Sequence, residues 1–462
     1  MNRPTLPETD PVNLRPRPSR ASGAAGLLVL SALPVALAAL LAAGALAQEE
    51  RPSDAPIIKI TGSAMSKVPI AIPRFDGGGT PKGDEAASTL YEVLRDDLLF
   101  SNYFKLVPDE YLKLVQPFAG RKTDYKEWQG IGADAVLVGT SRPEAAELTF
   151  EARVYDMGEQ RLALGKKYRA NTDQARLLAH RMADEIVLRY TGKPGIATSR
   201  IAYVSQVGKA KEIFVMDYDG ARPKKITSNN SINLSPSWSP DGQWIAFMSY
   251  RGGSPELKIL SNKGELRSAF PQKGELNSAP SWSPDGRLLA FSSGRDGNAE
   301  IYTLRPTDGS LTRLTRDGSI DTSPTWSPDG RSIAFTSDRG GSPQIYVMDS
   351  GGGNVRKLTG ELSYCDAPAW NPVPDESESI AFTARVPGGF DIYKFDLKEQ
   401  TLRRLTDGNG INEWPRWSPD GRHIVFASNR SGGFDVYTMD ADGDHVRRLT
   451  RGGSNTSPSW AR

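Results

Sequence analysis

The feature that most constrains the fold of this 462-residue chain is a tryptophan-centred segment that recurs at a nearly constant interval. One copy, residues 323–335, reads Ser-Pro-Thr-Trp-Ser-Pro-Asp-Gly-Arg-Ser-Ile-Ala-Phe. The copies lie 44, 44, 44, 47 and 43 residues apart and are centred on Trp238, Trp282, Trp326, Trp370, Trp417 and Trp460. A period of this length is typical of propeller blades that contain about four strands. The second half of the chain is therefore predicted to be an array of blades.

Each repeat contains the residues that four strands and a tight turn require. Pro-x-Trp-Ser predicts the innermost strand. Ser-Pro-Asp-Gly predicts a turn, because proline presets φ, aspartate bonds to the nearby backbone and glycine accepts a positive φ. Ile-Ala-Phe, Ile-Tyr and Leu-Thr motifs predict three further strands. One phenylalanine column is expected to stack between blades: Phe247, Phe291, Phe335, Phe382 and Phe426.

The two ends of the array predict how the ring of blades closes. Residues 201–227 match the last three strands of a repeat, but no tryptophan strand precedes them. Residues 457–460, Ser-Pro-Ser-Trp, supply such a strand after the last full copy. Pairing these segments would cover both open sheet edges. We therefore predict a six-bladed β-propeller over residues 198–462, closed by strand exchange between its ends.

Residues 1–47 are predicted to be a signal peptide. Arginines precede an apolar run over residues 21–46, and Ala45-Leu46-Ala47 places small residues where signal peptidase cleaves. Cleavage is expected between Ala47 and Gln48. A retained membrane anchor is the alternative, because the apolar run is long enough to span a bilayer.

The segment between the signal peptide and the repeats is predicted to form a separate mixed α/β domain over residues 57–192. Strand-like and helix-like patterns alternate there. Strands are expected at 57–60, 69–75, 135–139 and 148–155, and helices at 85–99 and 172–190. Residues 48–60 are expected to be a mobile partner-binding segment that orders on binding. The predicted fold class is thus two-domain, with the α/β domain followed by the propeller.

Composition argues against several classes of function. Residues 48–462 carry 53 basic and 53 acidic side chains, which gives no support for nucleic-acid binding because that binding depends on neutralising phosphates. The single cysteine, Cys365, cannot form an internal disulfide. The three histidines are not at ligand spacing, so neither a metal site nor a catalytic histidine cluster is expected: His180, His423 and His445.

The chain is expected not to be an enzyme, and no catalytic residue is assigned. Similar propellers gate serine peptidases, but no Gly-x-Ser-x-Gly motif occurs in this sequence. Two alternatives stay open. One is a propeller that gates or assists a peptidase, and the other is a propeller that binds a small ligand in its channel.

The Ser-Pro-Asp-Gly-x-x-Ile-Ala-Phe repeats, the α/β domain before them and the segment 57–75 resemble the TolB family, the periplasmic component of the bacterial Tol-Pal cell-envelope system. The resemblance implies a monomeric periplasmic binding protein that does not insert into the membrane after processing. It also implies that the propeller docks the lipoprotein Pal and that the mature N-terminal segment engages TolA of the inner-membrane complex. Such a relay supports outer-membrane integrity and invagination during cell division.

The resemblance also implies which residues bind. The TolA contacts fall in the N-terminal segment, at Gln48, Glu49, Glu50, Ile57 and Ile58. The Pal surface falls at the mouth of the propeller channel, just before the tryptophan strands, at Leu276, Asn277, Ala279, Asp321, Thr322, Asp366 and Glu413.

A polar column lies three residues before the proline of each innermost strand and is expected to ring the channel entrance. Its members are Asn233, Asn277, Asp321, Cys365, Asn412 and Asn455. The alternative is that these side chains cap the strand starts through backbone hydrogen bonds. No cofactor is expected, apart from a calcium ion in the channel for which Asp321, Asp366 and Glu413 would provide oxygen ligands.

Overall fold

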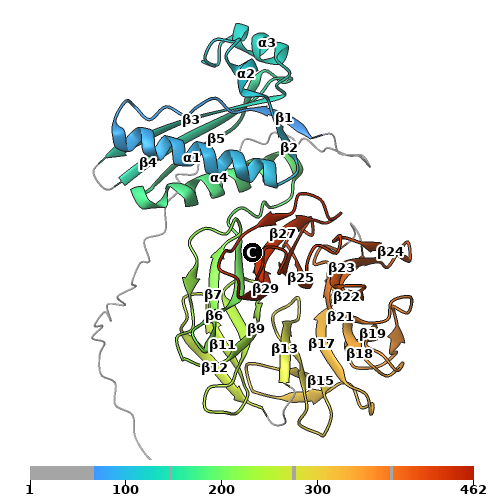
Figure 1. The fold of residues 1–462 in the computed structure, drawn as a ribbon. Helices are drawn as coiled ribbons and strands as arrows, with labels where there is room; N and C mark the ends of the chain where they lie inside the picture. The colour runs from blue at the N-terminus through green and yellow to red at the C-terminus, as the bar shows by residue number, and fades with distance from the viewer. Residues whose placement is uncertain (1–66, 145–146, 273–276, 375–377, 462) are drawn as a thin grey trace, which may run out of the picture. The chain divides into compact units, whose positions relative to one another are not determined.

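The computed structural model describes residues 67–144, 147–272, 277–374 and 378–461 (Figure 1). The predicted signal peptide, its cleavage site and all the predicted TolA contacts lie outside these residues. None of the described helices is long and apolar enough to cross a membrane.

The first folded part is a five-stranded sheet with the order β2-β1-β3-β4-β5. Strand β1 is parallel to β2 and β3, whereas β3, β4 and β5 are antiparallel. The strands are β1 (Val68–Ala71), β2 (Phe104–Leu106), β3 (Ala135–Glu144), β4 (Glu147–Asp156) and β5 (Arg161–Asn171). The helices are α1 (Pro81–Phe100), α2 (Asp109–Leu112), α3 (Lys122–Gly130), the 3-10 turn η1 (Thr172–Gln174) and α4 (Ala175–Thr191). This arrangement is the mixed α/β fold that the alternating patterns predicted.

Local signals explain where the two long helices begin and end. At the start of α1, the Thr80 hydroxyl accepts a hydrogen bond from the Gly83 amide at 3.2 Å, which satisfies one unpaired donor of the first turn. Helix α4 ends at Gly192, whose φ of 71° is the left-handed conformation that favours glycine. The core-facing side of α1 carries fully buried leucines at helical spacing: Leu90, Leu94 and Leu98.

Six four-stranded antiparallel sheets follow and form the blades of a propeller (Figure 1). In order from the channel outward, the strands are β29 (Asn455–Ala461), β6 (Arg200–Val207), β7 (Ala210–Asp217), β8 (Lys224–Lys225); β9 (Asn233–Trp238), β10 (Trp244–Ser249), β11 (Glu256–Ser261), β12 (Leu266–Pro271); β13 (Asn277–Trp282), β14 (Leu289–Ser293), β15 (Glu300–Leu304), β16 (Leu311–Arg313); β17 (Asp321–Trp326), β18 (Ser332–Ser337), β19 (Gln344–Asp349), β20 (Arg356–Lys357); β21 (Cys365–Trp370), β22 (Ser379–Val386), β23 (Gly389–Asp396), β24 (Thr401–Arg404); β25 (Asn412–Trp417), β26 (His423–Ser428), β27 (Asp435–Asp440) and β28 (Arg447–Arg448).

The last strand of the chain completes the sheet that begins at Arg200. Strand β29 pairs antiparallel with β6, and Trp460 lies opposite Ile201 in the register. One blade is therefore built from both ends of the propeller segment, as the repeat pattern predicted.

The repeated Ser-Pro-Asp-Gly motif forms the predicted turn. In the copy after β17, the Ser327 hydroxyl donates to Asp329 Oδ1 at 2.5 Å, and the Arg331 amide donates to the same oxygen at 3.0 Å. Gly330 has a φ of 71°, which a residue with a side chain adopts at a cost.

The phenylalanine column packs between blades, as predicted. All five rings are buried. Phe291 of β14, for example, lies in one apolar cluster with Met248 and Leu257 of the preceding blade. Burial of a ring of this size stabilises the contact between neighbouring blades by about 1.5–3 kcal/mol relative to leaving it exposed.

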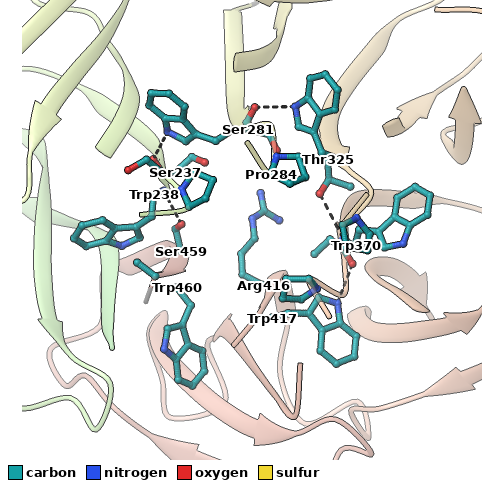
Figure 2. Close-up of a pocket in the computed structure, with 18 of the residues that line it drawn as sticks. Ser237, Trp238, Ser281, Pro284, Thr325, Trp370, Arg416, Trp417, Ser459 and Trp460 are labelled. Atoms are coloured by element: carbon teal, nitrogen blue, oxygen red, sulfur yellow. Dashed lines mark hydrogen bonds between the residues drawn. The ribbon is translucent and has the colours of Figure 1, made fainter. Parts of the chain in front are cut away.

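The tryptophans join neighbouring blades by hydrogen bonds (Figure 2). The indole Nε1 of Trp282 donates to the Ser237 carbonyl at 3.2 Å, and that of Trp326 donates to the Ser281 carbonyl at 3.2 Å. Trp417 repeats the contact to the carbonyl of Ala369 at 2.9 Å. Each of these bonds ties an innermost strand to the innermost strand of the blade before it.

Candidate functional site at the channel mouth

Every innermost strand contains a β-bulge close to its start. The pairing register shifts at this point in all six sheets. The third residue of each strand has a positive φ, between 49° and 56°, although none is a glycine: Ser235, Ala279, Ser323, Ala367, Trp414 and Ser457. A bulge re-aims the side chains beside it. The six bulges therefore decide which residues face the channel.

The polar column does not ring the channel entrance, so the prediction made from the sequence is wrong on this point. Its described side chains are buried, with at most 6% of their surface exposed. Asn412 Nδ2 donates to Asp391 at 2.8 Å, and Asn455 Nδ2 donates to Asp435 at 2.8 Å, so both bind the third strand of the preceding blade. The side chain of Asn277 lies outside the described residues.

Asp321 belongs to this buried column and is not available to a partner at the surface. Its carboxylate is fully buried and accepts a hydrogen bond from the Arg339 guanidinium at 2.8 Å within the same blade. Cys365 is likewise buried, and burial raises the pKa of its thiol to about 11. These residues stabilise the starts of the strands, because buried polar groups need partners.

The residues one position later are half-buried in all six strands: Leu234, Ser278, Thr322, Asp366, Glu413 and Thr456. We call this set the mouth ring. It contains three of the predicted Pal contacts, whereas Ala279 is the bulge residue of β13 and Leu276 lies outside the described residues. Alternation along a strand explains the shift, since neighbouring residues point to opposite sides.

In five of the six repeats the residue one position before the polar column is apolar, whereas Ser454 takes this place in the last. We call these apolar residues the rim, and sequence reasoning identified it only at Leu276. Ile232 and Ile320 are each 45% exposed, and Tyr364 and Ile411 are half-buried. The sequence contains a signal for this rim, because an apolar residue recurs at this position of the repeat. Exposed apolar groups gathered on one face are typical of a protein interface.

Aromatic rings extend this rim. Tyr364 and Phe390 meet edge to face, with ring centroids 5.6 Å apart, and the Arg385 guanidinium lies 5.6 Å from each ring. Trp414 and Phe434 form a second pair, with centroids 6.0 Å apart. Phe390 and Phe434 lie at the start of β23 and just before β27, the third strands of their blades. The sequence did not indicate that these two residues lie near the mouth.

Two neighbouring carboxyl groups of the mouth ring give it an acidic centre. Asp366 Oδ1 accepts hydrogen bonds from the hydroxyl of Thr336 at 2.8 Å and from the hydroxyl of Ser323 at 3.2 Å. Burial, reinforced by the negative charge of Asp366, raises the pKa of Glu413. Asp321 does not join them, because it is paired with Arg339 inside its blade.

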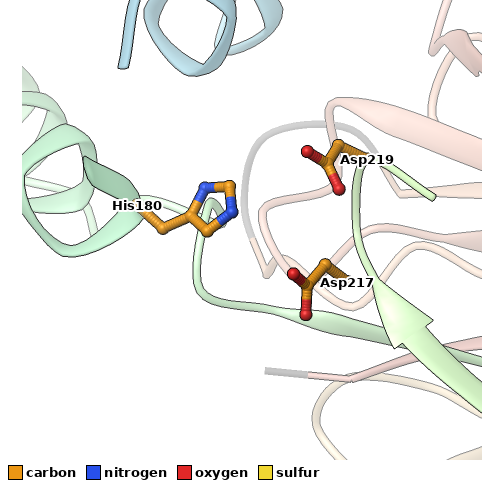
Figure 3. A group of neighbouring side chains, drawn as sticks. All are labelled: His180, Asp217 and Asp219. Carbon is orange, nitrogen blue, oxygen red and sulfur yellow. The ribbon is translucent and has the colours of Figure 1, made fainter. Parts of the chain in front are cut away.

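A histidine and two aspartates meet at a second place, between α4 and the end of β7 (Figure 3). The ligand atoms of His180, Asp217 and Asp219 lie within 4.8 Å of one another, a grouping that histidine spacing in the sequence did not predict. His180 Nδ1 lies 2.8 Å from the buried carboxylate of Asp97. Both aspartates of the group are already paired with guanidinium groups, those of Arg222 and Arg176. We interpret the group as a polar network between helix α4 and the end of strand β7.

Two family models match this chain. Residues 56–163 match the TolB amino-terminal domain, and residues 187–372 and 362–462 match the TolB beta propeller domain. The propeller model alone covers more than half of the chain. The chain belongs to the TolB family. Membership agrees with the α/β sheet and the six blades described above.

Individual TolB relatives support the same assignment. The chain is 39% identical to "Tol-Pal system protein TolB" from Desulfosudis oleivorans over 41% of its own length and 44% of the relative's. It is 35% identical to the protein of the same name from Roseobacter denitrificans, over 46% and 48%. The matched region thus spans about half the length of these relatives. The crystal structure of TolB from Acinetobacter baumannii superposes with a TM-score of 0.72 at 29% identity, covering 86% of this chain and 97% of that one.

The raised pKa of Glu413 predicts a pH-dependent effect of Glu413→Gln on stability. A carboxyl group whose pKa is raised by folding stabilises the folded state fully at a pH below its unfolded-state pKa of about 4.5. This stabilisation is lost as the pH rises through the folded-state pKa. Glu413→Gln should therefore melt a few degrees higher than the unmodified protein at pH 7, and the gap should close below about pH 4.5. Melting temperatures measured between pH 4 and pH 7 test this prediction. Glu399→Gln is the control, because Glu399 is exposed. A lower melting temperature for Glu413→Gln at pH 7 would contradict the burial argument.

Proposed function

We propose that this protein is a non-catalytic periplasmic component of the Tol-Pal system that binds Pal at the channel mouth of the propeller and TolA through its N-terminal segment. Family membership and the names of the relatives support the system. The observation that carries the binding role is the apolar and aromatic rim around the mouth ring. As a monomeric relay between the two partners, the protein supports outer-membrane integrity and invagination during division.

The chemistry of the mouth suits a folded protein partner. Aromatic residues and arginine dominate the binding energy of protein interfaces, and Tyr364, Arg385 and Trp414 supply both kinds on one face. Because Asp366 and Glu413 make the centre of this face acidic, the partner is expected to present a basic or hydrogen-bond-donating group there.

The same face offers no arrangement suited to nucleophilic catalysis among its described residues. The single cysteine, Cys365, lies next to the mouth ring, but a buried and protonated thiol is a poor nucleophile. Asp366 accepts hydrogen bonds from two hydroxyl groups of the preceding blade. These contacts favour a binding surface over a peptidase-like site.

Replacing an exposed apolar residue of the rim with a charged one should weaken Pal binding. Ile320→Glu is expected to reduce the affinity for a purified Pal domain at least about tenfold, because the carboxylate would be desolvated in the interface. Leu266→Glu is the matched control, since Leu266 is 61% exposed on the outermost strand of its blade. Isothermal titration calorimetry measures both. Equal affinities for the two variants would count against the mouth as the Pal surface.

The TolA role is proposed for residues 48–60 on the family resemblance, and we propose that occupancy of this segment changes the affinity for Pal. Deleting residues 48–60 should abolish TolA binding and change the Pal affinity about fivefold or more. The melting temperature of the deletion variant controls for folding. Unchanged Pal affinity would show that the two sites are independent, and retained TolA binding would place the TolA site elsewhere.

A further inference from the structure

A cavity of about 370 Å³ lies at the end of the innermost strands that is away from the mouth ring. All six strands contribute to it, each with its tryptophan and most with the neighbouring prolines. The residue before each tryptophan also lines the cavity: Ser237, Ser281, Thr325, Ala369, Arg416 and Ser459. Cavities of this size hold small molecules.

Arg416 gives the cavity its charge. It is the one charged residue among the described residues that line the cavity, and its side chain extends into the middle of the ring of tryptophans (Figure 2). Its Nη1 donates to the carbonyl of Pro415 at 2.9 Å. A guanidinium has five N–H donors, and the other side chains that line the cavity are neutral.

The side chain of Arg416 is half-buried, so its charge is partly desolvated. Burial lowers the pKa of Arg416 to about 10, and the negative charge of Asp366 opposes this effect only in part. The group therefore remains positive at neutral pH. A desolvated charge without a bound counter-charge destabilises a folded protein. An anion in the cavity would remove that cost.

Hydroxyl groups around Arg416 are available as further donors. Ser459 Oγ accepts from the Trp238 amide at 3.3 Å, and Thr325 Oγ1 accepts from the Trp370 amide at 3.4 Å. Each hydroxyl keeps its own hydrogen for another acceptor. The indole and proline rings between them form apolar walls.

We propose that this cavity is a binding site for a small organic anion, whose carboxylate pairs with Arg416 and whose apolar body packs against the tryptophan and proline rings. The planar guanidinium matches a carboxylate with two parallel hydrogen bonds. None of the residues that line the cavity belongs to the mouth ring or to the segment 48–60.

Benzoate is the test ligand, because it combines a carboxylate with an apolar ring, and the tryptophans that line the cavity report its binding. Titrating the full-length mature protein with benzoate should quench tryptophan fluorescence to saturation at millimolar concentrations and raise the melting temperature. The neutral isostere benzamide should bind at least about tenfold more weakly, or about 1.4 kcal/mol. Inorganic phosphate, an anion without an apolar body, should also bind more weakly than benzoate.

Variants of Arg416 test whether its guanidinium is required for benzoate binding. Arg416→Gln should lose at least about tenfold in benzoate affinity. Arg331→Gln, whose arginine is exposed and lies outside the cavity, should bind like the unmodified protein. If Arg416→Gln fails to fold, Arg416→Lys keeps the charge and should bind with intermediate affinity. Equal binding of benzoate and benzamide, saturation by phosphate alone, or no saturable response to benzoate would each overturn the proposal.

Discussion

The hydrogen bond from a tryptophan indole to the backbone of the neighbouring innermost strand holds the centre of this propeller together. Three blades repeat the same bond to a carbonyl in the innermost strand of the preceding blade, with lengths of 2.9–3.2 Å. At the closure, Trp460 instead donates to the hydroxyl of Ser199 at 2.8 Å, just before β6. Nε1 of Trp238 and Nε1 of Trp370 make no such bond among the described residues. The three indole bonds to carbonyl groups link neighbouring blades at the end of the innermost strands that is opposite the mouth ring.

The bulges set the direction of the side chains at the mouth. Positive φ values at residues other than glycine are strained and persist only where the surrounding structure supports them. The support here comes from the preceding blade: the Ser323 amide donates to the Ser292 hydroxyl at 3.2 Å, and the Trp414 amide donates to the Thr383 hydroxyl at 3.2 Å. Blade-to-blade contacts therefore determine both the fold and the direction of the side chains at the mouth.

The sequence was sufficient to predict whatever depends on local chemistry. The turn at Ser327 to Gly330, the buried phenylalanines and the pairing of the last strand with β6 all follow from motifs within a repeat. The direction of side chains at the mouth did not follow, because a bulge leaves no fixed signature among residues as different as Ser323 and Trp414. The column that seemed to face the channel proved to be buried, and the adjacent residues face it instead.

The side-chain positions of Tyr364 and Arg416 could not be predicted from the sequence either. Tyr364 and Phe390 are brought together by strand pairing, and Arg416 occupies a position where other repeats have serine, threonine or alanine. The repeat spacing places the six residues that precede the tryptophans around one axis, but it does not show that the Arg416 side chain extends into the space between them. The geometry thus separates two surfaces at opposite ends of the same strands. One is suited to a protein and the other to a small anion.

Hydrogen–deuterium exchange of the full chain, measured with and without a purified Pal domain, tests whether the mouth is the partner surface. We expect slower exchange in the segments that precede the innermost strands, such as residues 317–323 and 361–367, and unchanged exchange in the Ser-Pro-Asp-Gly turns at the other end. Protection of those turns or of the outermost strands, with the mouth segments unchanged, would contradict it.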